Sequence, residues 1–388
     1  MRKLTIITLL FFAALSCAAQ GSAVMLATIY PGKDVWNVYG HTMIIVQRPG
    51  SFTAYNYGVF DFNEPNFVYR FLRGDANYCI EAMPGEYALT NPKGRKTVVQ
   101  VFDLTEAQVD EVEAFLNWNI RPENRNYKYN FARDNCSTRV RDIILKAAGD
   151  SLSINLEPQH VTYRDLFDHY NANYAWQKFG INLILGPGID YELSLDEEMF
   201  LPMVMMRAFD KAEITRNGEK VPFVVNRLVT QEGREEGNID EPTPLWMTPE
   251  VVFFVLLLLT LWFSAKRYKG KFMVNFMRAF DFVLFLAFAL AGCIVAFLVF
   301  FSNHYATSPN LNLLVFNPLM AVIAVLSVLP VLPGKEIALR KAHLVFIAAS
   351  ALWGICQLFG VQTVPIAADI LILTPLARSC VKAARRNS

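Results

Sequence analysis

The carboxyl-terminal part of the chain alternates between long hydrophobic runs and short basic loops, and this alternation restricts the fold more than any other feature. Five runs are apolar enough to enter lipid, at about residues 250–264, 280–301, 313–332, 343–359 and 362–377. Backbone polar groups inside a bilayer must be satisfied within their own segment, so each run is expected to be helical. The first and last runs are short, which leaves four or five membrane spans.

Basic residues indicate which side of the membrane each loop occupies. Lys and Arg occur in the segments 266–278, 335–341 and 378–386, whereas the loops 302–312 and 359–363 contain neither. By the positive-inside rule, the basic segments are cytoplasmic. The globular part that precedes the first run is therefore expected to lie outside the cytoplasm.

The amino-terminal residues predict the same orientation. MRKLTIITLLFFAALSCAAQ has a basic start, an apolar run too short to span a bilayer, and small residues up to Ala19. Residues 1–19 are therefore predicted to be a secretory signal peptide, with an uncleaved anchor as the alternative. A lipobox at Cys17 is disfavoured because Leu15 lies one position too close to it.

The predicted fold class is an exported α+β domain followed by a helical multi-span membrane domain. The exported domain is assigned to residues 20–230, an acidic, Pro-rich linker to 231–248, the membrane domain to 249–378 and a cytoplasmic tail to 379–388. The hydrophobic fraction of 53% is too high for two ordinary soluble domains. Strands are predicted at residues 40–48, 52–60 and 96–104, which are rich in β-branched and aromatic residues.

Helices are predicted after these strands. Thr105 and Gln108 form a capping box at the start of one helix, and a second runs from Asn135 to a stop at Gly149. Further predicted helices cover residues 163–179 and 194–209, and NGEK at 217–220 predicts a hairpin turn. Within the second of these helices, the Met-rich segment 200–206 is either a core helix or a lipid-contacting surface.

Charge and motifs exclude several functions. The net charge of +1 comes from 36 basic and 35 acidic residues, so no overall field favours nucleic acid as a partner. No cluster of His, Cys and carboxylate residues has metal-ligand spacing, and no Gly-rich phosphate loop follows a predicted strand. We therefore expect neither a metal nor another cofactor.

Cys136 lies at the start of a predicted helix, in ARDNCSTRVRDIIL. Cys79 and Cys136 are the two cysteines on the exported side, and three states are open to Cys136: a disulfide, an inert buried thiol or a nucleophile. Asp134 and Asn135 are good helix caps, and the first turn of a helix stabilises an anion. This position therefore favours a reactive thiolate.

A nucleophilic cysteine also needs a base, and the exported domain offers His41, His160 and His169. His41 begins a predicted strand directly after Gly40, which would let another backbone or a substrate approach closely. The other two histidines lie among polar residues, where a solvated side chain is the more common outcome. His41 is the preferred base, although a histidine in such a position is often structural.

A histidine-bearing strand followed by a cysteine at a helix start resembles the circularly permuted papain-like enzymes, the branch that contains lecithin:retinol acyltransferase. A closer resemblance is to the exported domain of the Lnb-type lipoprotein N-acyltransferases of Bacteroidota. It rests on YGHTMIIV, YNYGVFDF, FLRGDANY, GRKTVVQVFDL, NYKYNFARDNCSTRVRD and EEMFLP, in that order. The similarity continues into NHYATSPNLNLLVFNPL after the second hydrophobic run and covers most of the mature chain.

This resemblance implies a thiol acyltransferase in which Cys136 is the nucleophile and His41 is the general base. Asn56 or Tyr57, on the adjoining strand, would orient the imidazole, and strand alternation admits one of the two to the face of His41. Simpler alternatives are an Arg139–Asp142 ion pair and packing roles for the tyrosines. The candidate substrate-binding residues are Asn135, Arg139, Tyr127, Tyr129, His304 and Asn310.

The implied reaction moves a lipid acyl chain through a Cys136 thioester to the α-amine of the N-terminal S-glyceryl cysteine of bacterial lipoproteins. Its partners would be diacylglyceryl-modified lipoproteins, at the outer face of the inner membrane. The acyl donor is either a membrane phospholipid or the lipoprotein's own glycerol ester. Two alternatives remain: a membrane-tethered phospholipase or cysteine hydrolase with the same Cys–His dyad, and a non-enzymatic transport or assembly subunit.

Overall fold

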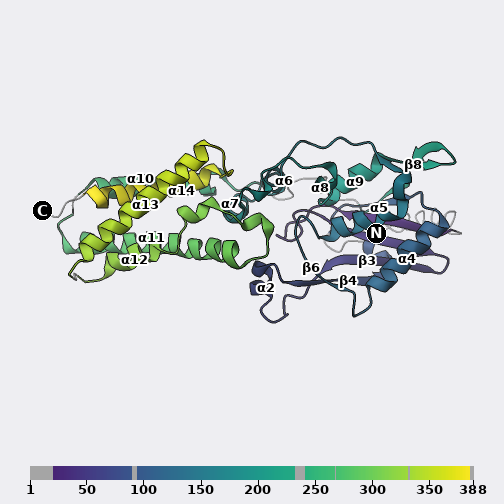
Figure 1. Ribbon diagram of the computed structural model, residues 1–388, viewed down its shortest axis with the longest axis horizontal. Coiled ribbons are helices and arrows are strands. Elements are labelled where there is room, and N and C mark those ends of the chain that lie inside the picture. The colour runs from purple at the N-terminus through teal and green to yellow at the C-terminus, as the bar shows by residue number, and fades with distance from the viewer. Residues whose placement is uncertain (1–20, 90–93, 232–240, 267, 331–332, 385–388) are drawn as a thin grey trace. The chain divides into compact units, whose positions relative to one another are not determined.

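The computed structural model describes residues 21–89, 94–231, 241–266, 268–330 and 333–384. The chain divides into two compact units. The first unit comprises Met1–Val161 and Glu192–Asp240, and the second comprises Thr162–Tyr191 and Glu241–Ser388 (Figure 1). The expected signal peptide and residues 232–240 of the expected linker lie outside the described residues.

A large antiparallel sheet forms the base of the first unit. In the described residues it has seven strands, in the order β10-β5-β1-β2-β3-β4-β6. The predicted strands are confirmed as β2, β3 and β5. The strands of this sheet are β1 (Ala23–Ile29), β2 (His41–Arg48), β3 (Ser51–Val59), β4 (Asn77–Pro84), β5 (Thr97–Phe102), β6 (Asn126–Lys128) and β10 (Val224–Gln231).

A smaller sheet pairs β7 (Leu152–Ile154), β8 (Ala212–Arg216) and β9 (Glu219–Pro222). Asn217 and Gly218 connect β8 to β9 with positive φ angles of 52° and 87°. Asn and Gly tolerate this left-handed conformation, so the hairpin turn predicted at NGEK is confirmed.

Helices α4 (Glu106–Asn119) and α5 (Cys136–Ala148) pack against each other and against the large sheet (Figure 1). Both begin where the sequence predicts. The side chain of Thr105 accepts a hydrogen bond from the Gln108 amide, completing the predicted capping box, and Asn135 caps α5. The shorter helices α2 (Phe67–Arg73) and α3 (Glu86–Leu89) precede them in the chain.

The predicted helix over residues 194–209 is two helices, α8 (Leu195–Glu198) and α9 (Pro202–Asp210). The break falls at Pro202 because proline has no N–H to continue the first helix but is well suited to begin the second. The Met-rich segment that spans the break is core, not a lipid-contacting surface. Its large apolar residues are at most 3% exposed: Phe200, Leu201, Met203, Val204, Met205 and Met206.

The second unit is helical. Two of its described helices, α11 (Lys271–Phe301) and α13 (Lys335–Leu358), are long and apolar enough to cross a membrane, and α10 (Pro249–Ala265) is a shorter apolar helix. α12 (Met320–Val328) and α14 (Ile366–Ala384) occupy the remaining two predicted runs. α14 extends to Ala384, so the expected cytoplasmic tail, residues 379–388, begins as helix.

The segment Thr162–Tyr191 belongs to this helical unit although it lies within the expected exported domain. The single helix predicted over residues 163–179 is two helices, α6 (Tyr163–Tyr170) and α7 (Ala175–Ile184). The side-chain amide of Asn171 donates 2.7 Å to the carbonyl of Phe167 and closes the end of α6. Such a local side-chain hydrogen bond competes with continuation of the helix.

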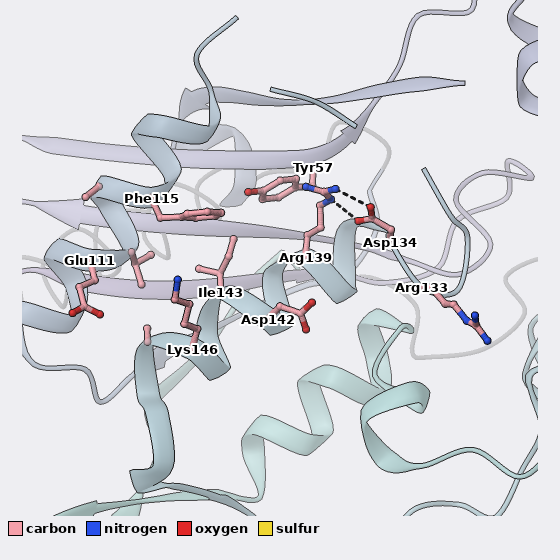
Figure 2. A pocket seen from close by; sticks show the side chains of 12 residues that line it. Tyr57, Glu111, Phe115, Arg133, Asp134, Arg139, Asp142, Ile143 and Lys146 are labelled. Carbon is pink, nitrogen blue, oxygen red and sulfur yellow. Dashed lines mark hydrogen bonds and ion pairs between the residues drawn. The ribbon is translucent and has the colours of Figure 1, made fainter. Parts of the chain in front are cut away.

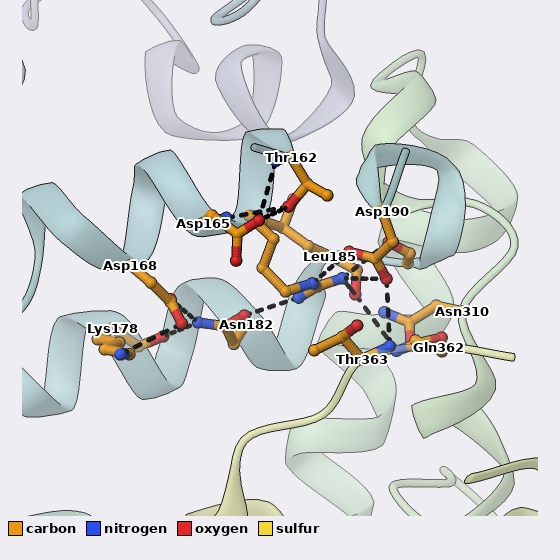
Figure 3. A network of polar contacts seen from close by, with 12 residues as sticks. Thr162, Asp165, Asp168, Lys178, Asn182, Leu185, Asp190, Asn310, Gln362 and Thr363 are labelled. Carbon is orange, nitrogen blue, oxygen red and sulfur yellow. Dashed lines mark hydrogen bonds and ion pairs between the residues drawn. The ribbon is translucent and has the colours of Figure 1, made fainter. Parts of the chain in front are cut away.

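A buried arginine, Arg164, organises this segment, and Figure 3 labels its partners Asn182, Leu185 and Asp190. The Arg164 side chain is 4% exposed and donates 2.6 Å to Asp190 and 2.7 Å to the Asn182 side-chain oxygen. Its guanidinium also donates to the carbonyls of Leu185 and Gly186. A buried guanidinium is tolerated only when its donors are satisfied, so these bonds fix the turn after α7.

Loops of the membrane part join the same network (Figure 3). Asn310 donates 3.2 Å to the Leu183 carbonyl, and Gln362 donates 3.3 Å to the Leu185 carbonyl and 3.1 Å to the oxygen of Asn310. Both side chains are at most 6% exposed. The uncharged loops around residues 302–312 and 359–363 therefore hold the α7 segment.

Candidate active site

Cys136 is the first residue of α5, and the turn before it is fixed by Asn135. The Asn135 side-chain oxygen accepts hydrogen bonds from the amides of Ser137 at 2.8 Å and Thr138 at 2.9 Å. Its amide nitrogen donates 2.9 Å to the carbonyls of Phe131 and Phe200. Asn135 is 5% exposed, and all these contacts are with backbone, so it positions the helix start.

His41 lies at the first position of β2 and forms a side-chain hydrogen bond with Cys136. The preceding Gly40 has a φ of +81°, and a β-carbon there would lie 2.9 Å from the Ile29 carbonyl oxygen. The sequence allowed either another backbone segment or a substrate to approach Gly40 closely. In the structure the backbone of Ile29 makes this approach. This close contact between Gly40 and Ile29 positions the start of β2, so that His41 lies next to the start of α5.

Asn56 is the residue of β3 that meets the base. Its side-chain oxygen lies 2.7 Å from Nε2 of His41. Tyr57 points to the other face of the strand, where its hydroxyl donates 2.6 Å to Asn119 of α4. Strand alternation left the choice between Asn56 and Tyr57 open. The choice is decided by the face of β3 that packs on α4, because Tyr57 lies on that face and Asn56 does not.

Thr42 is a contact of Cys136 that the sequence analysis did not identify. Its hydroxyl donates 3.0 Å to the Cys136 carbonyl, and its backbone amide and side chain both help to lower the pKa of the thiol. Thr42 is fully buried. The available signal was its position directly after His41, at the strand start that meets the beginning of α5.

The electrostatics favour an ion pair. Burial alone would raise the pKa of the Cys136 thiol, but the charge of His41 and the hydrogen bonds from His41 and Thr42 lower the pKa below its ordinary value of 9.0. Burial would lower the pKa of His41, but the Cys136 thiolate and the hydrogen bonds with Cys136 and Asn56 raise it above 6.5. Both shifts favour the thiolate–imidazolium pair over the neutral pair.

Arg139 pairs with Asp134, through bonds of 2.5 and 2.8 Å, and not with Asp142. The expected Arg139–Asp142 ion pair is wrong because Asp142 pairs instead with Arg141, at 2.7 Å. The Arg139 guanidinium lies 3.7 Å from the centre of the Tyr127 ring. This stacking links the helix that carries the thiol to strand β6.

A row of aromatic rings leads from the thiol to the surface of the first unit. Tyr127 packs against Tyr78, Tyr78 against Phe60, Phe60 against Phe62, and Phe62 against Trp36, with centroid distances between 4.7 and 6.5 Å. Tyr129 stacks on Tyr78 at 4.2 Å. Phe62 and Trp36 are each 57% exposed, so the row reaches solvent.

A surface groove of about 890 Å³ lies between α4 and α5 (Figure 2). Figure 2 shows the Arg139–Asp134 pair beside the Tyr57 ring at one end of the groove. Glu111 and Lys146 add charges of both signs to its lining, which does not include Cys136. The groove therefore borders the arginine side of the candidate site and leaves the thiol outside it.

The remaining candidates belong to other segments of the chain. His160 pairs with Glu192 in an exposed ion pair of the first unit, and His169 belongs to α6 of the second unit. His304 and Asn310 also belong to the second unit. Cys79 lies on β4 as a free thiol, so the disulfide with Cys136 is not formed.

No group of three His, Cys, Asp or Glu side chains within the described residues is arranged to hold a metal ion. A thiolate at a helix start faces an imidazole, and a side-chain amide orients that imidazole. This arrangement is the one used by thiol nucleophiles in covalent acyl transfer.

The fold and site define a class: an α+β domain with a cysteine–histidine pair, joined to a helical membrane domain. A family model described as the Lnb N-terminal periplasmic domain matches residues 15–169, and a second, described as the Lnb transmembrane domain, matches residues 241–387. The chain therefore belongs to the Lnb family, and the resemblance inferred from its motifs is confirmed. No curated protein and no solved structure matches the chain.

Family membership makes this chain a membrane protein with a periplasmic domain. It also places the chain among membrane enzymes that process lipoproteins. The cysteine–histidine pair lies in the part of the chain that the periplasmic model matches.

Proposed function

We propose that this protein is a multi-pass lipoprotein N-acyltransferase of the inner membrane. It transfers a lipid acyl chain, through a thioester on Cys136, to the α-amine of the N-terminal S-glyceryl cysteine of a lipoprotein. The observation that carries the proposal is the contact of Cys136 with His41, whose Nε2 is held 2.7 Å from Asn56. A membrane-attached periplasmic domain is located where both the lipid and the lipoprotein are found.

In the first step, the Cys136 thiolate attacks the carbonyl carbon of an acyl ester and forms a C–S bond. With Nε2 of His41 occupied by Asn56, Nδ1 is the nitrogen that can exchange a proton near the thiol. The imidazolium donates this proton to the departing alkoxide as the C–O bond breaks. The products of this step are an acyl thioester, an alcohol and a neutral His41.

In the second step, the α-amine attacks the thioester carbonyl. Neutral His41 accepts the proton that the amine loses, the C–N bond forms and the C–S bond breaks. The reference pKa of an α-amine, about 7.7–8.0, leaves a useful neutral fraction at physiological pH. Thioesters undergo aminolysis more readily than oxygen esters, which is a chemical reason to employ cysteine.

The aromatic row supports a lipid substrate. Trp36 and Phe62 are exposed on the surface, and Phe60, Tyr78 and Tyr127 continue the row to the vicinity of the thiol. Such a wall contacts an acyl chain without offering a row of charges that would have to be desolvated. We assign this row as the surface that holds the acyl chain during transfer.

The test is mass spectrometry of lipoprotein amino-terminal peptides from a bacterial host that lacks its own N-acyltransferase. The full chain should convert the free α-amine to an amide, and Cys136→Ala and His41→Ala should abolish or strongly reduce this. Cys79→Ala is the matched control, because Cys79 is the other free thiol of the described periplasmic domain, and it should retain activity. A free amine with the wild-type chain would reject the acyltransferase.

The same spectra identify the acyl donor and the competing reaction. Transfer from a phospholipid adds a third acyl chain to the peptide. Transfer from the lipoprotein's own glycerol ester leaves the total at two chains and moves one of them to nitrogen. If fatty acid is released by the wild-type chain while the amine stays free, the thioester is hydrolysed and the protein is a cysteine hydrolase.

A further inference from the structure

Both proposed steps pass through a tetrahedral intermediate whose oxygen carries a negative charge. Hydrogen-bond donors that face this oxygen provide much of the catalysis in acyl transfer. The amides of Ser137 and Thr138, at the start of α5, are already bound by the Asn135 side chain. In the first turn, the backbone amide of Cys136 is therefore the donor available to the oxyanion. A second donor to the oxyanion would come from another element.

Tyr127 of β6 has a hydroxyl suited to this task. Its oxygen is buried and has no hydrogen-bond partner among the described residues, although the ring itself is held by Arg139 and neighbouring aromatic side chains. Tyr127 as a whole is 9% exposed. A buried hydroxyl without a partner costs free energy, so its retention points to a partner that arrives during the reaction.

Gly58 shows where that partner fits. A β-carbon built on Gly58 would lie 3.7 Å from Cβ of Cys136 and 4.0 Å from the hydroxyl oxygen of Tyr127. The absence of a side chain at Gly58 therefore keeps open the space that borders both the nucleophile and the phenol. Its φ of +89° is a conformation that glycine adopts without strain.

We infer that Tyr127 is a catalytic residue whose hydroxyl donates to the oxyanion in the space beside Gly58. This inference rests on the acyl-thioester chemistry proposed above and adds a donor to it. The acyl carbonyl lies over Gly58, with its carbon toward the sulfur of Cys136 and its oxygen toward the phenol. No proton is transferred by Tyr127, which stabilises the charge in both steps by hydrogen bonding.

The surroundings keep this phenol protonated. Burial raises the pKa of Tyr127 far above its ordinary value of 10.0, and the Cys136 thiolate raises it further. The guanidinium of Arg139 opposes this rise, and Asp134 holds the guanidinium in place against the ring. The hydroxyl is therefore a donor throughout the pH range in which the thiolate reacts.

The experiment compares two reactions of Cys136 in the purified full-length chain. The first is acylation by a p-nitrophenyl ester of a fatty acid, followed as the burst of p-nitrophenolate, and this reaction forms an oxyanion. The second is alkylation by iodoacetamide, a displacement that forms none. Tyr127→Phe should slow acylation by about 10²–10³-fold, the usual effect of removing one oxyanion donor, and change alkylation by less than about 3-fold.

Tyr55→Phe is the matched control, because Tyr55 is a buried tyrosine of β3 whose hydroxyl donates 2.9 Å to Asn117. It should leave both rates within about 2-fold of wild type. Acylation of Tyr127→Phe at the wild-type rate, or an equal loss of both reactions, would overturn the inference. A wild-type chain that forms the thioester but never passes it to an amine would instead reject the proposed function and leave the role of Tyr127 standing.

Discussion

The hydroxyl of Thr42 donates 3.0 Å to the backbone carbonyl of Cys136 and also reaches the thiol. This contact joins the strand that carries the base to the helix that carries the nucleophile. His41 and Thr42 are adjacent in the chain, so a single strand end supplies both the charge and the hydrogen bonds that stabilise the thiolate. The geometry of the pair therefore depends on how β2 meets α5.

Thr42→Val tests this contact, because valine preserves the shape of threonine and removes its hydroxyl. We expect the pKa of Cys136 to rise and its alkylation at neutral pH to slow by about 5- to 10-fold, since each pKa unit is a factor of ten in thiolate. The measurement is the rate of iodoacetamide alkylation against pH. Thr42→Ser keeps the hydroxyl and should stay close to wild type; equal slowing in both variants would mean that the hydroxyl is not responsible.

Asn56→Ala should reduce acyl transfer by about 10- to 100-fold, by analogy with the loss of a group that orients a metal-ligating histidine. The physical reason is loss of the 2.7 Å contact with Nε2 of His41, which leaves the ring free to rotate. Asn56→Asp retains an acceptor and should recover most of the rate. The burst assay gives the rates, and the view that Asn56 orients His41 fails if the alanine variant acylates normally.

The pH profile of acylation should depend on both members of the Cys136–His41 pair. Thiolate is lost as pH falls through the lowered pKa of Cys136, and the proton donor is lost as pH rises through the raised pKa of His41. Acylation should therefore be bell-shaped, and the thiolate should persist below the ordinary thiol value of 9.0. In His41→Ala, burial of the thiol remains without the opposing charge of His41, so the pH midpoint of alkylation should rise above that of the wild-type chain.

Arg164→Ala should destabilise the helical unit by about 3–5 kcal/mol, because it leaves Asp190 without its buried partner. The measurement is the temperature at which the detergent-solubilised full chain loses its monodisperse size-exclusion peak. Lys178→Ala is the control, since its ion pair with Asp168 joins side chains that are 37% and 32% exposed. A substitution there should cost at most about 1 kcal/mol, and equal effects of the two variants would argue against a special role for the buried pair.

Features that depend on neighbouring residues alone were predictable. The capping box of Thr105 and Gln108, the cap at Asn135 and the turn at Asn217–Gly218 are local, and each forms where the sequence predicts. The hydrophobic runs likewise coincide with helices, because a long apolar segment can satisfy its backbone only within itself. The nucleophile and the base were singled out by a helix start and a strand start.

Partner choice was decided by the tertiary structure. Asn56 and Tyr57 are equivalent candidates in the sequence, and only the packing of α4 on one face of β3 assigns Tyr57 to Asn119 and leaves Asn56 to His41. Arg139 pairs with Asp134 instead of Asp142, because the turn before α5 brings Asp134 back to the helix.

The sequence by itself determined that the chain has an exported α+β part and a membrane part, and that Cys136 begins a helix. Tertiary structure alone placed Tyr127, Gly58 and Thr42 around the thiol and assigned the segment Thr162–Tyr191 to the helical unit. The physical reason is the sequence separation over which each kind of interaction acts. Capping and hydrophobic periodicity act between residues a few positions apart, whereas these contacts join strands and helices that the chain brings together only after the sheet has formed.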